Sequence, residues 1–380
     1  MKEIDELKPM LYELSKEIFE NPETAYEEYK ASKLLSETLE KEGFEVKKDI
    51  CNIETAFKAQ YGEGKVKIAF LAEYDALPGV GHGCGHNIIA AAALGAGMAL
   101  KRAIEKKNLD ATVYVIGCPA EEAEGAKVLF AEKGVFDDVD LALMIHPGNK
   151  TLITEHFLAI KELRFKFYGK PSHAAASPEE GINALDGVIQ TFNSINALRQ
   201  HLREDVRIHG IITHGGDAPN IVPKYAEAYF FVRATDNEYL EETLKKVKNC
   251  AKGASTATGA ELTIEEGKGY KAFYPNKVLA DLFEKHLRSM DITIDEPDEF
   301  GGQGSSDIGN VSCVVPSLHP FIRITEEELR GHSQEFARAA ISGKGNEAIL
   351  IGAEAMVLTA LDIIEETKLL KEVKDTFLPR

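Results

Sequence analysis

The stretch AEYDALPGVGHGCGHN, residues 72–87, holds two acids, two histidines and a cysteine among mostly small residues. It follows an apolar run, VKIAFL (66–71), and precedes an alanine-rich run, IIAAAALGAG (88–97). A short unbroken apolar run is typical of a strand buried on both faces, and small side chains let the following helix pack closely on a sheet. The stretch therefore predicts a polar cluster between a buried strand and the helix that covers it.

The same alternation continues along the chain. Short apolar runs at 112–118 and 140–145 alternate with helical patterns at 88–104 and 123–133. This rhythm predicts an α/β domain with a mostly parallel sheet flanked by helices.

The pattern changes in the middle of the chain. Residues 160–275 contain strands that alternate apolar with polar positions, together with two helical stretches, which predicts a smaller α+β domain whose sheet has one solvated face. Beyond it the first pattern returns, with an expected strand at VSCVVPSL (311–318) and a long last helix. We therefore expect a discontinuous α/β domain, 1–159 with 276–380, that carries the smaller domain as an insertion.

The composition excludes several classes of protein. The chain has 380 residues, 44% of them hydrophobic and 28% charged, as in a globular protein. A net charge of −18 without clusters of Lys and Arg excludes a nucleic-acid partner. We expect no membrane partner and a cytoplasmic location, because no apolar stretch reaches about 20 residues and the start, MKEIDELKPM, lacks a signal-peptide core. Five scattered cysteines do not suggest a disulfide framework.

Polar side chains follow three of the predicted strands. In open α/β sheets, ligands bind at the carboxyl ends of the strands, so these side chains are expected at one edge. Thiolate, imidazole and carboxylate together form a ligand set for zinc, and manganese accepts most of it. The candidates are Glu73, Asp75, His82, Cys84 and His86 after the first strand, Glu121 and Glu122 after the second, and His146 after the third.

The local sequence around Cys84 suggests how it is presented. Asn87 is expected to cap the following helix, and the positive end of that helix would favour the thiolate form of Cys84. The glycines at 81, 83 and 85 allow the backbone to turn without steric cost.

Other interpretations of these residues remain open. Cys84 could be the nucleophile of a cysteine amidase, with His82 or His86 as its base. A structural zinc site usually has four Cys or His ligands and no additional carboxylates. Two adjacent glutamates at the start of a helix often do no more than interact favourably with the helix dipole.

Taken together, the motifs resemble those of the M20 metallopeptidases. The resemblance is to the amidohydrolase branch of that family, which includes aminobenzoyl-glutamate hydrolases, N-acyl-amino-acid hydrolases and PM20D2-like dipeptidases. It covers nearly the whole chain through NPETAYEEYKAS, LAEYDALP, HGCGHN, GCPAEE, LMIHPG, GKPSHAAASPEEGINALD, GGDAPNIVP, GSSDIGNVS and GHSQEFA.

The resemblance implies a metallopeptidase fold, a role for each matching residue and a set of partners. It implies two divalent ions per subunit, zinc or manganese, held by Cys84, His86, Glu122, His146 and His332. Glu121 would be the general base and Asp75 would orient a metal-bound histidine, while His173 and Asn220 would contact substrate from the inserted domain. That domain would be a ferredoxin-like lid that forms a homodimer or a higher homo-oligomer. The substrate would be a small amide or dipeptide.

The chain departs from much of the branch at two positions. Asn87 stands where many members carry Asp, and Glu73 stands where many carry Asp before the DALP segment. Both lie beside the implied ligands, so the set of ligands is retained. A relative that binds a ligand without hydrolysing it is the remaining non-enzymatic alternative.

Overall fold

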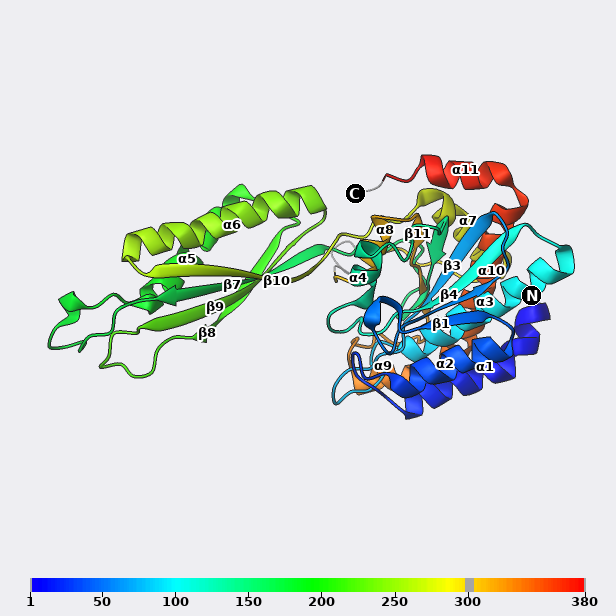
Figure 1. Ribbon diagram of the computed structural model, residues 1–380, viewed down its shortest axis with the longest axis horizontal. Coiled ribbons are helices and arrows are strands. Elements are labelled where there is room, and N and C mark those ends of the chain that lie inside the picture. The colour runs from blue at the N-terminus through cyan, green and yellow to red at the C-terminus, as the bar shows by residue number, and fades with distance from the viewer. Residues whose placement is uncertain (1, 298–303, 379–380) are drawn as a thin grey trace. The chain divides into compact units, whose positions relative to one another are not determined.

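The computed structural model describes residues 2–297 and 304–378, and these form two compact units. Unit 1 consists of Met1–His156 and Phe273–Arg380, and unit 2 is Phe157–Ala272. In Figure 1, unit 2 is the green part of the chain and unit 1 contains both termini. The sequence placed the boundaries of the insertion at 160 and 275, three residues from each of these limits.

Unit 1 is built on a six-stranded mixed sheet. Its central strands are parallel, because β3 pairs in parallel with β4 and β5, and β5 pairs in parallel with β11. On the other side β2 runs antiparallel to both β4 and β1. The strand order is β1 (Glu45–Lys48), β2 (Phe57–Tyr61), β4 (Ala111–Gly117), β3 (Val66–Ala72), β5 (Leu141–Leu143) and β11 (Ser317–Leu318). A second, two-stranded parallel sheet joins β6 (His146–Gly148) to β12 (Phe321–Arg323).

Helices cover this sheet, and the main hydrophobic core of unit 1 lies between the helices and the sheet. The alanine-rich helix α3 (His86–Lys107) packs against α1, α10 and the strands β3 and β4. Its small residues allow this approach, since a Cβ atom at Gly97 would lie only 2.3 Å from Cγ2 of Val115. The others are α1 (Lys2–Glu20), α2 (Tyr29–Lys41), η1 (Ile50–Asn52), α4 (Ala126–Glu132), α7 (Lys277–Ser289), α8 (Ile308–Ser312), α9 (Gln334–Ala340), α10 (Gly343–Glu365) and α11 (Thr367–Asp375).

Helix α3 is also long and apolar enough to cross a membrane by length and composition. However, 89% of its most apolar window is buried inside the protein, as in the core helix of a globular domain. Among the described residues it is the one helix that meets this criterion.

Unit 2 is a four-stranded antiparallel sheet with two helices. The strand order is β10-β7-β9-β8, and the elements follow the chain order of a ferredoxin-like fold. Buried and partly exposed residues alternate strictly along β9, because α5 and α6 pack against the sheet and leave its other face solvated. The elements are β7 (Ala159–Tyr168), η2 (Pro178–Glu180), α5 (Ala184–Leu198), η3 (Arg199–His201), β8 (Arg207–His214), β9 (Tyr225–Ala234), α6 (Asn237–Thr258) and β10 (Glu261–Tyr270).

Two expected elements differ from the structure. Only Ser317–Leu318 of the apolar run 311–318 is a strand, and its first residues end helix α8 instead. A short apolar run does not by itself distinguish a buried strand from a buried helix. The helix expected at 123–133 begins at Ala126, so Glu121 and Glu122 lie in the turn before it.

Candidate metal centre

The end of β3 places the first part of the site. Nδ1 of His86 lies 2.9 Å from the carbonyl oxygen of Asp75 and 3.0 Å from its Oδ1. Both side chains are buried. Burial pulls the pKa of His86 down, but the Asp75 carboxylate beside it raises that pKa well above its usual value. Asp75 thus holds Nδ1 of the ring and leaves Nε2 facing the site.

Cys84 belongs to two groups of potential ligands at once. Its sulfur lies within 4.8 Å of ligand atoms of His86 and His146, and also within 4.8 Å of ligand atoms of Glu122 and His332. The five residues come from three strand ends and from the loop before α9, which is 248 positions after Cys84 in the chain. The fold therefore brings together all five ligands that the resemblance implied, and it places the thiol between two groups.

The donor atoms in these groups fit a divalent cation. Nε2 of His86 and Oε1 of Glu122 are buried side-chain atoms without a hydrogen-bond partner. They lie 3.9 Å apart, and Nε2 of His332 lies 3.7 Å from Oε2 of Glu122. Buried polar atoms rarely lack a partner, so atoms that converge in this way fit the coordination of a cation. Sulfur, imidazole and carboxylate are also the donor types that zinc accepts.

His146 and His332 differ in how the fold holds them. Nδ1 of His146 lies 2.7 Å from the carbonyl oxygen of Pro147, and burial lowers the pKa of this histidine to about 4. A neutral imidazole with Nδ1 engaged is suited to coordinate a metal through Nε2. His332 is 60% exposed, and its backbone N–H donates to the carbonyl oxygen of Gly83 at 3.1 Å. This contact ties the late loop directly to the HGCGH turn.

Glu121 lies beside these ligands. Its carboxylate is 14% exposed, and Oε2 lies 3.9 Å from Nε2 of His86. Burial raises the pKa of Glu121 well above its usual value, and the Glu73 and Asp307 carboxylates raise it further. Glu73, His86 and Glu121 form a third group of close donor atoms. Glu121 therefore lies next to the implied ligands without belonging to either group that contains Cys84.

One local expectation about the HGCGHN turn was wrong, because Asn87 does not cap α3. Gly85, with φ of 74°, stands at the N-cap of α3, while the amide of Asn87 donates to Ser15 Oγ at 2.8 Å inside the core. Burial raises the pKa of the Cys84 thiol to about 12, and this outweighs the lowering effect of the nearby His86.

His82 supports the structure of the turn. It is buried, and Nε2 lies 3.1 Å from the carbonyl oxygen of Ile18 in α1. It does not belong to any ligand group found among the described residues. This placement agrees with its interpretation as a supporting residue.

The two candidate substrate contacts lie in unit 2. His173 pairs with Ile221 in an isolated β-bridge, and the N–H of Ala174 donates to the carbonyl oxygen of Asn220 at 3.0 Å. Nδ1 of His173 accepts from the N–H groups of Ala175 and Ala176. His173 and Asn220 are thus neighbours on the exposed surface of unit 2, whereas every candidate ligand lies in unit 1.

Sequence reasoning missed a buried ion triad next to the site. Nζ of Lys127 lies 2.6 Å from Oε1 of Glu73 and 2.6 Å from Oδ1 of Asp307, and all three side chains are at most 1% exposed. The other oxygen of Glu73 lies 3.4 Å from Nε2 of His86. Glu73 was named as a strand-end candidate and as a departure from the family, but Lys127 was not singled out. A lysine within an apolar helical stretch was the available signal.

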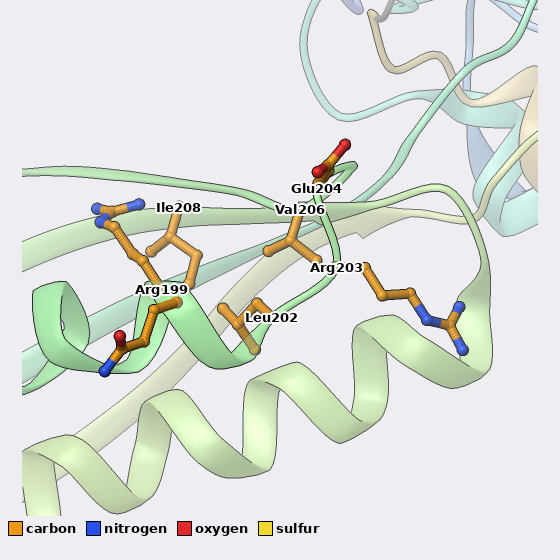
Figure 2. Close-up of a pocket in the computed structure, with 7 residues that line it drawn as sticks. Arg199, Leu202, Arg203, Glu204, Val206 and Ile208 are labelled. Atoms are coloured by element: carbon orange, nitrogen blue, oxygen red, sulfur yellow. The ribbon is translucent and has the colours of Figure 1, made fainter.

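A pocket elsewhere in the molecule does not resemble this site. Figure 2 shows it in unit 2, where η3 leads into β8. Arg199 donates to Asn196 at 3.2 Å, and Arg203 donates to Asp236 at 2.8 Å, so both arginines of the pocket are engaged. The described residues that line it include neither histidine nor cysteine.

Comparison with known proteins agrees with this description. Residues 159–257 match the model of the peptidase dimerisation domain of the M20 family. The Xaa-Arg dipeptidase of Mus musculus is 37% identical over 98% of this chain and 90% of its own length. A p-aminobenzoyl-glutamate hydrolase chain of Escherichia coli is 35% identical over 72% of this chain and 61% of its own length.

A solved structure shows the same fold. The dinuclear metal-binding M20 peptidase of Bacillus subtilis superposes with a TM-score of 0.74 at 18% identity, covering 95% of this chain and 99% of the other. At this identity the superposition shows the fold alone, and the sequence identity with the dipeptidase relative shows the family. The chain belongs to the M20 peptidase family.

Proposed function

We propose that this protein is a metal-dependent hydrolase of small amides. Its substrates would be N-acyl-amino acids, aminobenzoyl-glutamate-like compounds or small dipeptides, including dipeptides that end in arginine. The observation that carries the proposal is the position of Cys84 between two ligand groups, with Glu121 beside them. Relatives named as an Xaa-Arg dipeptidase and a p-aminobenzoyl-glutamate hydrolase support this range of substrates.

Five residues would hold two divalent ions, zinc or manganese. Cys84, His86 and His146 would bind one, and Cys84, Glu122 and His332 would bind the other. The unpaired Nε2 of His86 and Oε1 of Glu122 support this division. Divalent ions in such a site lower the pKa of water to about 7 and so supply a nucleophile at neutral pH.

The residues of the chain would then handle protons and orientation. Glu121, which would be ionised when cations lie beside it, would accept the proton of the attacking water and deliver it to the leaving nitrogen. Asp75 would keep the proton of His86 on Nδ1, at 3.0 Å from Oδ1, so that Nε2 stays available as a ligand. His173 and Asn220 would contact the substrate from unit 2.

The structure gives less support to a cysteine nucleophile. A nucleophilic thiol needs a lowered pKa, whereas burial raises the pKa of Cys84 to about 12. His82, one of the two bases considered, lies against Ile18 instead. A ligand-binding relative without turnover would have no use for Glu121, a carboxylate beside the ligands but outside both Cys84 groups.

One experiment tests the proposal. The purified protein is analysed for metal and assayed against Xaa-Arg dipeptides, β-alanyl dipeptides, aminobenzoyl-glutamate and N-acetyl amino acids. We expect about two equivalents of zinc or manganese and hydrolysis of at least one class. A metal-replete protein that cleaves none of them would contradict the proposal.

We also propose that the protein is cytoplasmic and forms a homodimer or a higher homo-oligomer through unit 2. The match to a dimerisation domain supports assembly through this unit. Strand β8 is an edge of its sheet, and Ile211 and Ile212 on it are 61% and 45% exposed. An edge strand with exposed apolar residues is suited to pair with another chain. All five cysteines are free thiols, in keeping with a reducing compartment.

A further inference from the structure

The turn that carries Glu121 and Glu122 has a strained backbone. It joins β4 to α4, and Ala120, directly before the two glutamates, has φ of 63°. Left-handed backbone is unfavourable for a residue with a Cβ atom and persists only where surrounding contacts hold it. The carbonyl oxygen of Ala120 accepts from the N–H groups of Ala123 and Gly125, which closes the turn on itself. These internal bonds do not fix the direction in which the turn points.

A buried carboxylate from a distant segment makes the external contact. Oε1 of Glu28 accepts the N–H of Ala120 at 2.9 Å, across 92 positions of the chain. The same oxygen accepts the N–H of Tyr26 at 2.9 Å, and Tyr26 also has positive φ, of 61°. Glu28 is fully buried. One carboxylate oxygen therefore joins two left-handed turns.

The side chain of Glu28 does not cap the helix at whose N-terminus it stands. Glu28 stands at the N-cap of α2 but makes no side-chain cap bond. Glu23 takes that role, since its carboxylate accepts the N–H groups of Lys30 and Ala31. The segment NPETAYEE thus caps the helix with one acid and leaves the other for the turn beside the metal centre.

A second carboxylate holds the other side of Glu121. Oδ2 of Asp75 accepts the N–H of Glu122 at 2.9 Å, while its Oδ1 faces His86. Glu121 is therefore flanked by two anchored peptide groups, one held by Glu28 and one by Asp75. We propose that Glu28 is a positioning residue, which holds the Ala120 turn and so sets the direction in which Glu121 and Glu122 project into the site.

Two substitutions separate this role from a role for charge. Burial raises the pKa of Glu28 to about 7, so a neutral side chain is a fair substitute near neutrality. Glu28→Gln keeps an acceptor oxygen at the same reach without the charge. Glu28→Asp keeps the charge, but the side chain is shorter by one methylene and its oxygen is withdrawn from Ala120. Glu27→Asp, at the exposed neighbouring position, is the matched control.

The test combines kinetics with residue-resolved hydrogen exchange on the full-length, metal-replete protein. In Glu28→Asp we expect kcat to fall by about 10- to 100-fold with little change in KM, because small displacements of a reacting group are costly. Exchange at Ala120 and Glu122 should accelerate in the same variant. Glu28→Gln should stay within about threefold of the unaltered protein in kcat, and Glu27→Asp should match it.

Several outcomes would overturn the inference. These are a folded Glu28→Asp variant with unchanged kcat, a Glu28→Gln variant impaired as strongly as Glu28→Asp, or an Ala120 amide that exchanges like an open loop in the unaltered protein. If Glu28→Asp fails to fold, the kcat of Glu28→Gln and the hydrogen exchange of the Ala120 amide in the unaltered protein decide whether the inference stands. Only the kinetic readout rests on the proposed function. If the unaltered protein hydrolyses nothing, that proposal fails, and exchange at Ala120 in the Gln and Asp variants still tests Glu28.

Discussion

Unit 1 and unit 2 bury their strands in different ways, and the difference separates chemistry from surface. Every residue of β4 in unit 1 is buried, whereas buried and partly exposed residues alternate along β9 in unit 2. A sheet covered on both faces places the polar groups at its strand ends in a dry environment, where charges interact strongly. A sheet with one solvated face leaves edges and side chains free for contacts. Substitutions matched between the units test this division.

The largest expected effect is on turnover in unit 1. Glu121→Gln removes the group that would accept and deliver the proton, and such groups contribute about 10²- to 10⁴-fold to rate. We expect kcat to fall by at least about 100-fold with metal content unchanged. Steady-state kinetics and metal analysis measure this. Retention of full activity would remove Glu121 from the mechanism.

The next effect is on stability, through the buried triad of Lys127, Glu73 and Asp307. Lys127→Met leaves two buried carboxylates without their cation, which should cost about 3–5 kcal/mol of unfolding free energy. The control is Lys277→Met, which breaks an exposed pair with Asp281 and should cost less than about 1 kcal/mol. Urea unfolding measures both. Equal losses in the two variants would mean that the triad is not a dry ion network.

Removal of metal should act on unit 1 in two ways. Prolonged dialysis against EDTA is expected to abolish hydrolysis and to lower the unfolding midpoint, since a cation bound only by the folded state stabilises it by about 3–4 kcal/mol at 100 to 1,000 times its Kd. Adding back zinc or manganese should restore both. Activity that survives metal-free dialysis would instead favour Cys84 as a nucleophile.

One glutamate in each unit should make the free energy of unfolding depend on pH, and the two dependences should have opposite sign. Because burial raises the pKa of Glu28 to about 7, its stabilising effect is complete below its unfolded pKa and is lost as the pH rises through 7. In unit 2 the hydrogen bond from Tyr225 lowers the pKa of Glu227, so its contribution is present above the usual pKa and is lost in acid.

Urea unfolding of Glu28→Gln and Glu227→Gln at several pH values checks this contrast. Relative to the unaltered protein, Glu28→Gln should gain stability between pH 5 and 8, by about 1–3 kcal/mol. Glu227→Gln should be less stable than the unaltered protein near neutral pH, and this difference should disappear only at lower pH. A Glu28→Gln difference that does not change with pH would show that Glu28 does not titrate in this window.

The smallest expected effect is on assembly of the oligomer, through the edge strand of unit 2. Ile211→Lys places a charge on the exposed edge strand β8, and a charge there discourages pairing with another strand. We expect the dissociation constant of the oligomer to rise by at least about tenfold in sedimentation velocity experiments. Ile341→Lys, at a 41% exposed isoleucine of unit 1, should have no effect on assembly. An identical shift in both variants would argue against assembly through β8.

Much of the candidate site could be predicted from the sequence because it is built at strand ends. The apolar runs before Cys84, Glu122 and His146 identified parallel strands, and parallel strands deliver their following residues to one edge. His332 has no such marker, and only the resemblance singled it out. The error at 311–318 and the misassigned cap at Asn87 arose because local pattern does not reveal which partner a buried group will find.

What the sequence by itself determined was the alternation of buried strands and helices, the insertion of a second pattern, and the residue types available at the strand ends. These follow from hydrophobic periodicity and local chemistry, which are written in adjacent residues. Only the tertiary structure decided that Cys84 faces two ligand groups, that Lys127 joins Glu73 to Asp307, and that Glu28 reaches Ala120. A buried polar group must find its partner wherever the fold brings one within hydrogen-bond distance, and separation along the chain does not limit that choice.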